Sequence, residues 1–380
     1  MKEIHINHYQ GLGSLNFIKD ILNINNAKRV FMVTGMNSFN LSTVHQTINS
    51  YFQERAVCHF NEFSHNPKLY DVCRGIDLLK QFNADIVVAI GGGSVIDMAK
   101  LINTLAAQSN RYTDIIKKKS QIMSKGVPLI AIPTTAGSGS EATKFAVVYI
   151  DGVKFSLEHI YLLPDYSIVD PMLTTTMSAH LTAITGLDAL AQAIESYWSI
   201  RSTDESKSYA AQAISMILPS FQTAVHEGII QAREKMSYAA NLAGKAINIS
   251  KTTGPHALSY ALTSQLNIAH GHAVALTLGK FFLLNSDLEN VELNEMRGRE
   301  YLKVTLNELY KLLSCKDAAE CSKKIYDLME NVGVESNFNN LGITKKWHID
   351  CLISNVNLDR LNNNPVKITK GILEDIFRCH

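Results

Sequence analysis

The stretch "DIVVAIGGGSVIDMAK", residues 85–100, joins an apolar run to three consecutive glycines and an amphipathic segment. A continuous apolar run is typical of a strand buried on both faces of a parallel sheet, and the pattern predicts a helix that begins near Ser94. Glycines let the backbone approach a ligand, and free N–H groups at a helix N-terminus favour an anion such as pyrophosphate. The stretch therefore predicts a phosphate-binding loop. A tight structural turn is the alternative, because the pattern is not the GxGxxG of a Rossmann domain.

Three similar apolar runs occur in the first half of the chain, with helical stretches between them. They are "RVFMVTG" (29–35), "VPLIAIPTT" (127–135) and "YSIVDP" (166–171). Together with the first stretch they predict an α/β domain built on a parallel sheet. A separate β-hairpin is predicted in "KFAVVYIDGVKFSL" (144–157), because Asp151-Gly152 tolerates the positive φ angles of a type I′ turn.

Beyond about residue 178 the pattern changes to long helical periodicity with few β-branched runs. Examples are "ESKSYAAQAISMILPSFQTAV" (205–225) and "ELNEMRGREYLKVTLNELYKLL" (292–313). We therefore predict an α/β domain over residues 1–177 and an all-α domain over residues 178–380.

Composition excludes several functional classes. The chain of 380 residues has a formal net charge of +1, so no excess of basic charge favours nucleic acid or a membrane surface. No apolar run approaches the roughly 18 residues of a membrane span, and the N-terminal residues lack the apolar core of a signal peptide. We expect a cytoplasmic protein. Its six cysteines form no CxxC pair, so they are expected to be reduced thiols.

A second loop, "IPTTAGSGSE" (132–141), follows another predicted strand and carries hydroxyl side chains suited to ribose and phosphate oxygens. Two such loops at the carboxyl ends of strands indicate a dinucleotide site. The candidate cofactor-binding residues are Gly91, Gly92, Gly93, Ser94, Asp97, Thr134, Thr135, Ser138 and Ser140.

The helical half carries a possible metal site. In "TGLDALAQAIESYW" (185–198), Asp188 and Gln192 stand four residues apart, so they share one face of the predicted helix. The segment "GPHALSYALTSQLNIAHGHAV" (254–274) adds His256 and His270. Two oxygen and two nitrogen donors suit a divalent metal. The alternative is that these histidines are ordinary core or surface residues.

Five motifs carry a resemblance to a known family. In chain order they are "GGGSVIDMAK", "PTTAGSGSEAT", "LLPDYSIVDP", "TAITGLDALAQAIESYWS" and "PHALSYALTSQLNIAHGHA". Their order and content resemble the iron-containing alcohol dehydrogenases, which share a dehydroquinate synthase-like fold. The resemblance implies an N-terminal dinucleotide-binding domain, a C-terminal metal domain, NAD(P)H as cofactor, and a homodimer. It places Fe²⁺ or Zn²⁺ on Asp188, Gln192, His256 and His270, and a small aldehyde or alcohol as the substrate.

The chain departs from the family pattern at three positions. The family usually has histidine where this chain has Gln192, and a neutral amide oxygen is a weaker donor than imidazole to a borderline metal. Many members have another histidine at the position of Tyr260, whose hydroxyl is a poorer proton relay near neutral pH. NAD-preferring relatives commonly have aspartate at Gly35. Without that carboxylate the 2′-phosphate of NADPH is not repelled, so NADPH can bind, with Asn37 and Ser38 as candidate contacts.

The segments "DALAQAIESYWSIRSTDESKSYA" and "AINISKTTGPHALSY" resemble the phosphonoacetaldehyde reductase branch, which makes 2-hydroxyethylphosphonate. A phosphonate dianion needs basic and hydroxyl partners. The candidate substrate-binding residues are Lys144, Lys154, Arg201, Lys251 and Thr252, although lysine and arginine are usually solvated surface residues.

The resemblance implies that the metal polarises the carbonyl and the nicotinamide delivers hydride, with His256, His270 and Tyr260 as catalytic residues. The alternatives are a general alcohol dehydrogenase, a lyase or cyclase on the same scaffold, and a dinucleotide-binding protein without catalysis.

Overall fold

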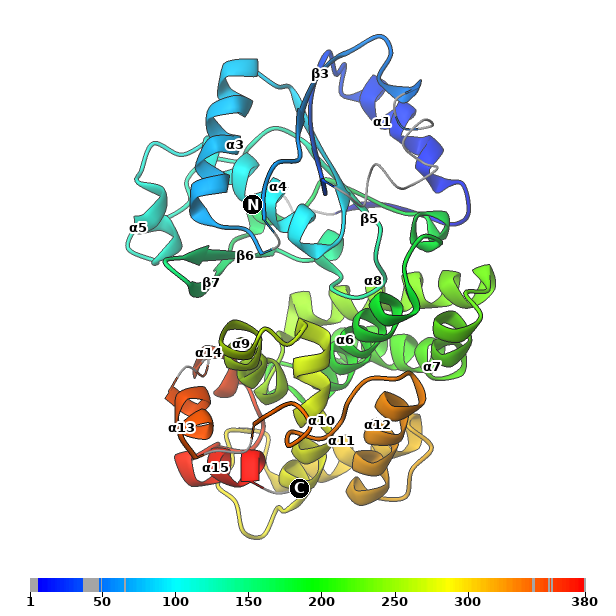
Figure 1. The fold of residues 1–380 in the computed structure, drawn as a ribbon, viewed down its shortest axis with the longest axis vertical. Coiled ribbons are helices and arrows are strands. Elements are labelled where there is room, and N and C mark those ends of the chain that lie inside the picture. The colour runs from blue at the N-terminus through cyan, green and yellow to red at the C-terminus, as the bar shows by residue number, and fades with distance from the viewer. Residues whose placement is uncertain are drawn as a thin grey trace. The chain divides into compact units, whose positions relative to one another are not determined.

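The computed structural model describes residues 6–36, 48, 50–64, 66–343, 346–354, 356 and 358–378. By its internal contacts the chain divides into two compact units, Met1–Met177 (unit 1) and Ser178–His380 (unit 2). Each unit is described separately below, with element labels as in Figure 1.

Unit 1 is built on a parallel sheet. Within the described residues the sheet has six strands in the order β1-β8-β5-β4-β2-β3, and all its pairs are parallel. The strands are β1 (Asn7–Gln10), β2 (Arg29–Thr34), β3 (Ala56–Phe60), β4 (Ile86–Gly91), β5 (Leu129–Pro133) and β8 (Tyr166–Val169). The helices are α1 (Phe17–Ile24), α3 (Leu69–Phe82), α4 (Gly93–Ala106) and α5 (Tyr112–Ile116). Short 3-10 turns cover Ser14–Asn16, Ser140–Ala142, Ile160–Leu162 and Pro171–Thr174.

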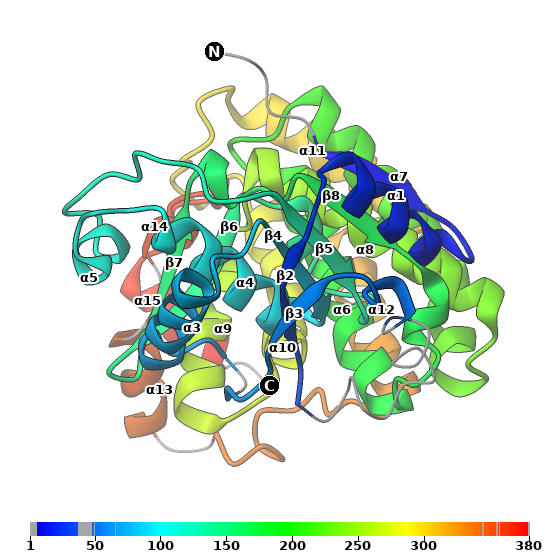
Figure 2. The same ribbon diagram turned by 90° about the horizontal axis from the view of Figure 1, so that it is seen from above.

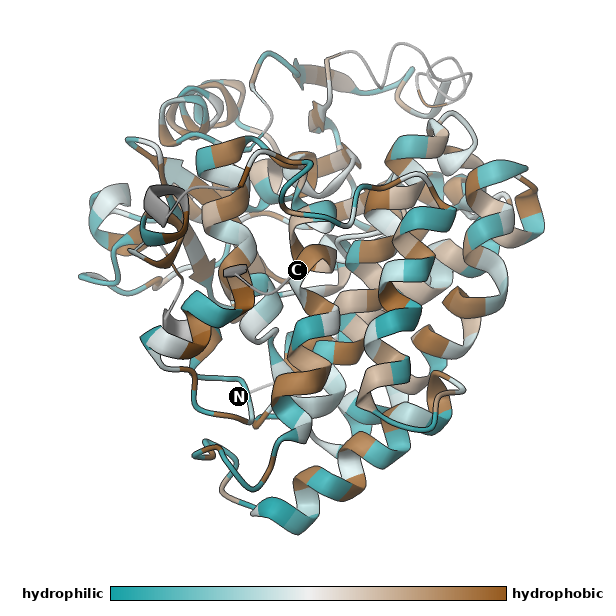
Figure 3. Ribbon diagram, turned by 60° about the horizontal axis from the view of Figure 1, so that its bottom comes forward, coloured by the Kyte–Doolittle hydropathy of each residue, from teal (hydrophilic) through white to brown (hydrophobic). Residues whose placement is uncertain are grey.

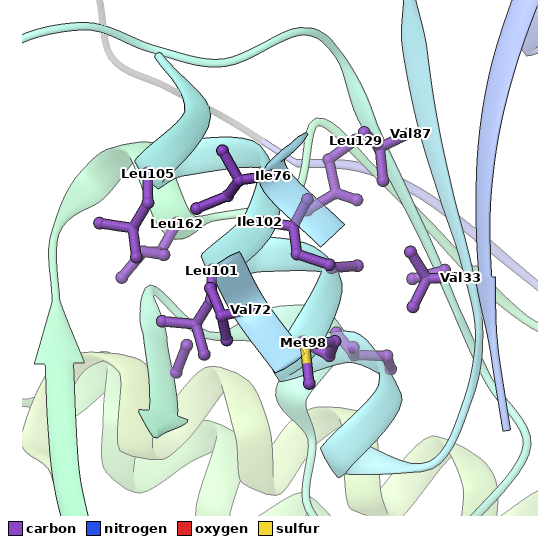
Figure 4. Close-up of a cluster of buried hydrophobic side chains, with 14 of the residues drawn as sticks. Val33, Val72, Ile76, Val87, Met98, Leu101, Ile102, Leu105, Leu129 and Leu162 are labelled. Atoms are coloured by element: carbon purple, nitrogen blue, oxygen red, sulfur yellow. The ribbon is translucent and has the colours of Figure 1, made fainter. Parts of the chain in front are cut away.

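The sheet is buried on both faces because its strands are apolar at successive positions. Figures 1 and 2 show α3 and α4 on one face and α1 on the other. Phe31 and Val33 of β2 pack with α3 and α4, while Val30 and Met32 of the same strand pack with α1. Figure 4 shows part of the first cluster, where Ile76 of α3 lies near side chains of α4. This two-sided burial explains the continuous rather than alternating hydrophobicity of the runs.

The four strands expected from apolar runs are confirmed as β2, β4, β5 and β8. The hairpin is also confirmed as β6 (Phe145–Ile150) and β7 (Val153–Glu158), with φ angles of 51° at Asp151 and 79° at Gly152. Sequence analysis did not predict β1 and β3, which form the two edges of the sheet. Both edges are largely exposed or half-buried, so they lack the apolar run that marks a central strand.

Unit 2 is helical, as expected. Its helices are α6 (Ala179–Trp198), α7 (Asp204–His226), α8 (Ile230–Ser250), α9 (Gly254–Leu266), α10 (His270–Ser286), α11 (Arg299–Leu312), α12 (Ala318–Asn331), α13 (Lys346–Ser354), α14 (Leu358–Leu361) and α15 (Lys370–Arg378). Apolar and polar residues alternate along these helices in Figure 3, as expected of helices with one buried face.

One helix prediction was too long. The segment 292–313 is helical only over α11, because Gly298 has a φ of 94°, a backbone conformation outside the helical region. Among the described helices, none combines the length and the apolar character that a membrane crossing requires. Cys58, Cys73, Cys315 and Cys321 are free thiols, as predicted for these four residues.

Candidate functional site

Helix α6 places three polar side chains in the interior of unit 2. The helix begins after Ser178, whose hydroxyl accepts a hydrogen bond from the backbone N–H of Leu181 at 3.1 Å. Asp188, Gln192 and Glu195 follow at intervals of four and three residues, so they share one face of the helix. All three side chains are buried. Buried polar groups need partners, so this face marks a site rather than ordinary helix packing.

Two histidines from other helices meet this face. His256 lies in the first turn of α9, and His270 is the first residue of α10. The Nε2 atoms of His256 and His270 lie 3.3 Å and 4.0 Å from Oδ1 of Asp188. One ligand atom of each of these three residues lies within 4.8 Å of the other two, which is close enough for one ion to touch all three. The structure therefore unites three of the four ligands suggested by the sequence.

The opposite nitrogen of each imidazole is held by a second residue. Nδ1 of His256 hydrogen-bonds Oε1 of Glu195, a carboxylate with no exposed surface. Nδ1 of His270 lies 3.3 Å from Oγ of Ser259, whose own hydrogen is donated to the carbonyl of His256 at 2.8 Å. Ser259 must then accept the hydrogen of Nδ1. In its neutral form each imidazole is thus held with a hydrogen on Nδ1 and a lone pair on Nε2.

In this centre, hydrogen-bond acceptor atoms of different residues face one another. Oδ1 of Asp188 faces the two Nε2 lone pairs, and among the described residues neither this atom nor the buried Oε1 of Gln192 has a well-formed hydrogen bond. Lone pairs facing one another are repulsive unless a cation lies between them. A divalent ion would satisfy Oδ1 of Asp188 and the two Nε2 atoms, and mixed carboxylate and imidazole donors suit such an ion. The residues present therefore fit a divalent metal.

The pKa shifts of these groups also show that the centre favours a positive charge. Burial lowers the pKa of His256, but the neighbouring Glu195 and Asp188 carboxylates outweigh burial and raise that pKa to about 9. Burial alone would raise the pKa of Asp188. The contact with His256 and the charge of His270 hold that pKa below its ordinary value instead. A proton therefore occupies this centre readily, and a metal ion would displace it.

Glu195 was missed as a site residue by sequence analysis, although it lies in the quoted helix. Its position seven residues after Asp188, on the same face, was the available signal. Tyr260, by contrast, was singled out, and it lies buried in α9 one turn after His256. The catalytic roles of Tyr260, His256 and His270 remain predictions.

In unit 1 the two predicted cofactor loops lie against each other. The first loop carries Gly91, Gly92, Gly93 and Ser94 at the junction of β4 and α4. The second loop follows β5 and carries Thr134, Thr135, Ser138 and Ser140. The backbone N–H of Thr134 donates to the carbonyl of Gly91 at 3.0 Å. A Cβ atom on Gly93 would lie 2.6 Å from Oγ of Ser138. Glycine is therefore required here for packing between the loops, in addition to any approach of a ligand.

Asp97 and Ser140 join a buried network that ties α4 to the second loop. Oγ of Ser140 donates to Oδ1 of Asp97 at 2.5 Å and accepts from Nζ of Lys100 at 3.1 Å. Nζ also donates to the carbonyl oxygens of Thr143 at 2.7 Å and Phe145 at 2.9 Å. Burial raises the pKa of Asp97 and lowers the pKa of Lys100 to about 8. The network shows Asp97 and Ser140 as supports of the loop, and their contact with a cofactor remains a prediction.

Lys100 was not singled out by sequence analysis, although it ends the glycine motif three residues after Asp97. This spacing places the two side chains on one face of α4. Gly35 follows the end of β2, while Asn37 and Ser38 lie outside the described residues.

The candidate substrate residues fall in different places. In unit 1, Lys144 pairs with Glu158 at 3.8 Å, and Lys154 lies in the hairpin strand β7. In unit 2, Arg201 is exposed after α6, while Lys251 and Thr252 join α8 to α9.

Hydrogen bonds bring the two unit 2 segments together. Oγ of Ser199 donates to the carbonyl of Ser250 at 2.8 Å and accepts the N–H of Arg201 at 3.1 Å. The side-chain amide of Asn363 donates to the carbonyls of Ser250 and Thr252, both at 2.9 Å. The backbone around Lys251 is therefore held firmly. Lys251 itself has φ 62° and ψ 173°, a conformation essentially confined to glycine.

Comparisons with known proteins bear on this site. The model of the iron-containing alcohol dehydrogenase family matches residues 7–171, and the model of the family's C-terminal domain matches residues 182–379. The chain is 34% identical to long-chain-alcohol dehydrogenase 1 of Geobacillus thermodenitrificans over 70% of this chain and 69% of that one. It is 35% identical to the probable alcohol dehydrogenase EutG of Escherichia coli over 73% and 68% of the two chains.

Solved structures show the same architecture. The crystal structure of sulfoacetaldehyde reductase from Bifidobacterium kashiwanohense in complex with NAD⁺ aligns with a TM-score of 0.88 and 30% identity. The alignment covers 98% of this chain and 96% of that one.

Proposed function

The chain belongs to the iron-containing alcohol dehydrogenase family, and on that premise we propose that it reduces phosphonoacetaldehyde to 2-hydroxyethylphosphonate with NAD(P)H. The family uses a nicotinamide cofactor and a divalent metal. The observation that carries the proposal is the centre in which His256 and His270 direct Nε2 toward one oxygen of Asp188.

Asp188, His256 and His270 would hold the metal, with the amide oxygen of Gln192 as a weaker fourth donor. When bound, the ion supplies Lewis-acid polarisation of a carbonyl group, and the nicotinamide supplies hydride. Glu195 and Ser259 keep the two imidazoles oriented by holding Nδ1 of each ring. The hydroxyl of Tyr260 is the proposed proton relay of the chain.

The cofactor part of the proposal rests on unit 1. The glycine loop leads into the N-terminus of α4, where Gly92 has no side chain to cap the helix. The first N–H groups of a helix have no partners within it and favour a phosphate group. Thr134 and Thr135 add hydroxyl groups beside this loop. The two loops thus offer the donors that a dinucleotide needs.

The anionic substrate is supported by Lys251. A lysine in a backbone conformation that costs about 1–3 kcal/mol is retained only where its surroundings or its function require it. The backbone of Arg201 is joined to the Ser250 segment through Ser199, and its guanidinium is the proposed second cation. The sulfoacetaldehyde reductase neighbour is named for a two-carbon aldehyde with an anionic head group, which is the same chemical type as phosphonoacetaldehyde.

An aldehyde panel tests this proposal. Metal-loaded protein would be assayed with phosphonoacetaldehyde, sulfoacetaldehyde and uncharged propanal, each with NADPH and with NADH. One buried charge-assisted hydrogen bond is worth about 1.5–3 kcal/mol, so phosphonoacetaldehyde should exceed propanal in kcat/KM by about tenfold or more. Lys251→Gln should raise KM for the two anionic aldehydes and leave KM for propanal unchanged. Lys235→Gln, at an exposed lysine of α8, is the matched control.

Each of the other outcomes would support a different function for this protein. Equal kcat/KM for the three aldehydes would leave a general alcohol dehydrogenase. Higher kcat/KM for sulfoacetaldehyde would keep the anionic class and change the head group. Cofactor binding without turnover would favour the binding protein, and product formation without net consumption of cofactor would favour a lyase or cyclase.

A further inference from the structure

Glu195 is a fully buried carboxylate that accepts hydrogen bonds through both oxygens. Oε1 accepts from Nδ1 of His256. Oε2 accepts from the backbone N–H of Thr253 at 2.6 Å, from Oγ of Thr253 at 2.9 Å and from the backbone N–H of His256 at 3.4 Å. Oγ of Thr253 accepts in turn from Nε1 of Trp198 at 2.9 Å, so its hydrogen points to Glu195. Every group around this carboxylate is a donor.

The charge of this region is not balanced by lysine or arginine. Among the described residues, the ion-pair partners of Asp188 and Glu195 are the imidazoles of His256 and His270 alone. With both imidazoles in the neutral form that binds a metal, the two buried carboxylates carry two negative charges that the rings do not compensate. A buried charge without compensation is costly. One divalent ion on the Nε2 side of His256 would make the set of groups neutral.

We propose that Glu195 is the positioning residue of the metal centre. It holds His256 with the hydrogen on Nδ1, keeps the Nε2 lone pair for the metal, and supplies the second negative charge that a divalent ion balances. The inference rests on the metal site of the proposed function and does not depend on the substrate. Removing a carboxylate that binds the far nitrogen of a ligating histidine typically lowers metal affinity about 10- to 100-fold.

The donors around Glu195 explain why glutamine cannot replace it. If the amide nitrogen took the place of Oε2, its hydrogens would face the N–H groups of Thr253 and His256. If the amide nitrogen took the place of Oε1, it would donate to Nδ1 of His256 and force the ring hydrogen onto Nε2. A protonated Nε2 has no lone pair for a metal. Either orientation weakens the site.

The test measures binding of Co²⁺ alone, by competition with a chelator, together with the visible absorption spectrum of the bound ion. Glu195→Gln should weaken Co²⁺ binding about 10- to 100-fold and alter the spectrum. Glu295→Gln is the matched control, because Glu295 is also a buried carboxylate of unit 2 but pairs with Arg297 at 2.7 Å. The control should bind Co²⁺ as the wild type does.

Unchanged Co²⁺ affinity in Glu195→Gln would overturn the proposal. If that variant does not fold, the wild type decides the question through long-range ¹H–¹⁵N spectra of histidine-labelled, Zn²⁺-loaded protein. The proposal requires His256 to carry a hydrogen on Nδ1 and zinc on Nε2, and the reverse assignment would refute it. A wild type that binds metal but reduces no aldehyde would refute the proposed function and leave the role of Glu195 intact.

Discussion

Gly271 and Ile184 bring two helices together backbone to backbone beside the metal ligands. A Cβ atom on Gly271 would lie 2.0 Å from the carbonyl oxygen of Ile184 and 2.9 Å from Cβ of Asp188. Only glycine permits this approach of α10 to α6. The contact places His270, the preceding residue, next to Asp188. The position of a metal ligand therefore depends on the absence of a side chain.

Gly271→Ala should destabilise unit 2 and weaken metal binding. The new methyl group meets backbone, which cannot rotate away, so the cost should reach the upper part of the about 1–3 kcal/mol typical of overpacking. The measurements are urea unfolding and Co²⁺ affinity. Gly371→Ala is the control, because its nearest neighbour would be Oγ of Thr369 at 3.9 Å. The control should gain stability, up to about 1 kcal/mol, from helix propensity. Equal effects of the two substitutions would contradict the close approach.

Gln192→His should tighten the metal site and change its selectivity. The buried Oε1 of Gln192 has no well-formed hydrogen bond. An imidazole nitrogen placed there as a metal ligand therefore breaks no hydrogen bond of that oxygen. Nitrogen is the better donor to Zn²⁺, while oxygen suits Mn²⁺. Affinity for Zn²⁺ should rise by about tenfold or more, and affinity for Mn²⁺ should rise less. Competition with a chelator measures both, and equal affinities of the two proteins would show that position 192 lies outside the coordination sphere.

Two substitutions at Lys251 separate the effect of backbone strain on stability from the effect of the charge on substrate binding. Lys251→Gly and Lys251→Ala both remove the amine, so both should raise KM for phosphonoacetaldehyde. Only glycine accepts φ 62° and ψ 173° without strain, which costs other residues about 1–3 kcal/mol. The greater flexibility of glycine in the unfolded chain offsets about 0.4–1 kcal/mol of that gain. Lys251→Gly should therefore unfold at a higher urea concentration than Lys251→Ala. The opposite order would show that the conformation is not strained in solution.

Lys100 should give the stability of unit 1 a specific dependence on pH. Burial lowers its pKa to about 8, whereas the unfolded chain has the ordinary value of 10.5. Between these values the unfolded state holds more protons than the folded state, so the free energy of unfolding rises with pH. The slope is at most about 1.4 kcal/mol per pH unit for one proton. Below about pH 8 both states are protonated and this contribution is constant.

The measurement is the free energy of unfolding of the wild type and of Lys100→Met at several pH values from about 7 to about 10. Subtracting the variant removes the contribution of titrating groups that do not interact with Lys100. The difference between wild type and variant should stay level below about pH 8 and grow with pH above it. A flat difference would mean that Lys100 titrates in the folded protein as it does in the unfolded chain.

Gly35→Asp should shift cofactor preference toward NADH. Gly35 follows the carboxyl end of β2, and an aspartate there would bond a ribose hydroxyl and repel a 2′-phosphate. The wild type should bind NADPH at least as well as NADH. Gly35→Asn separates the two effects, because asparagine can bond the ribose without repelling phosphate. Dissociation constants for both cofactors are the readout. A strong preference of the wild type for NADH would show that another group replaces the missing carboxylate.

Local patterns in the amino-acid sequence were enough to predict several parts of this protein. Continuous apolar runs predicted β2, β4, β5 and β8, because the burial of both faces of a strand is visible residue by residue. Asp151-Gly152 predicted the hairpin through its tolerance of positive φ. Resemblance of the motifs then identified Asp188, His256 and His270 as one group. The edge strands β1 and β3 were not visible, because an exposed edge has no apolar run to mark it.

The contacts that hold those residues in place join distant parts of the chain, so they became visible only in the folded protein. Glu195 and His256 are 61 residues apart in the chain, and no local pattern pairs them. The same holds for Lys100 with Thr143 and for Gly271 with Ile184. Hydrogen bonds and close packing act over about 3–4 Å between atoms that folding brings together, so their partners are set by the arrangement of whole helices. A sequence shows which residues carry chemistry, and the packing of α6, α9 and α10 decides which nitrogen each histidine turns toward Asp188.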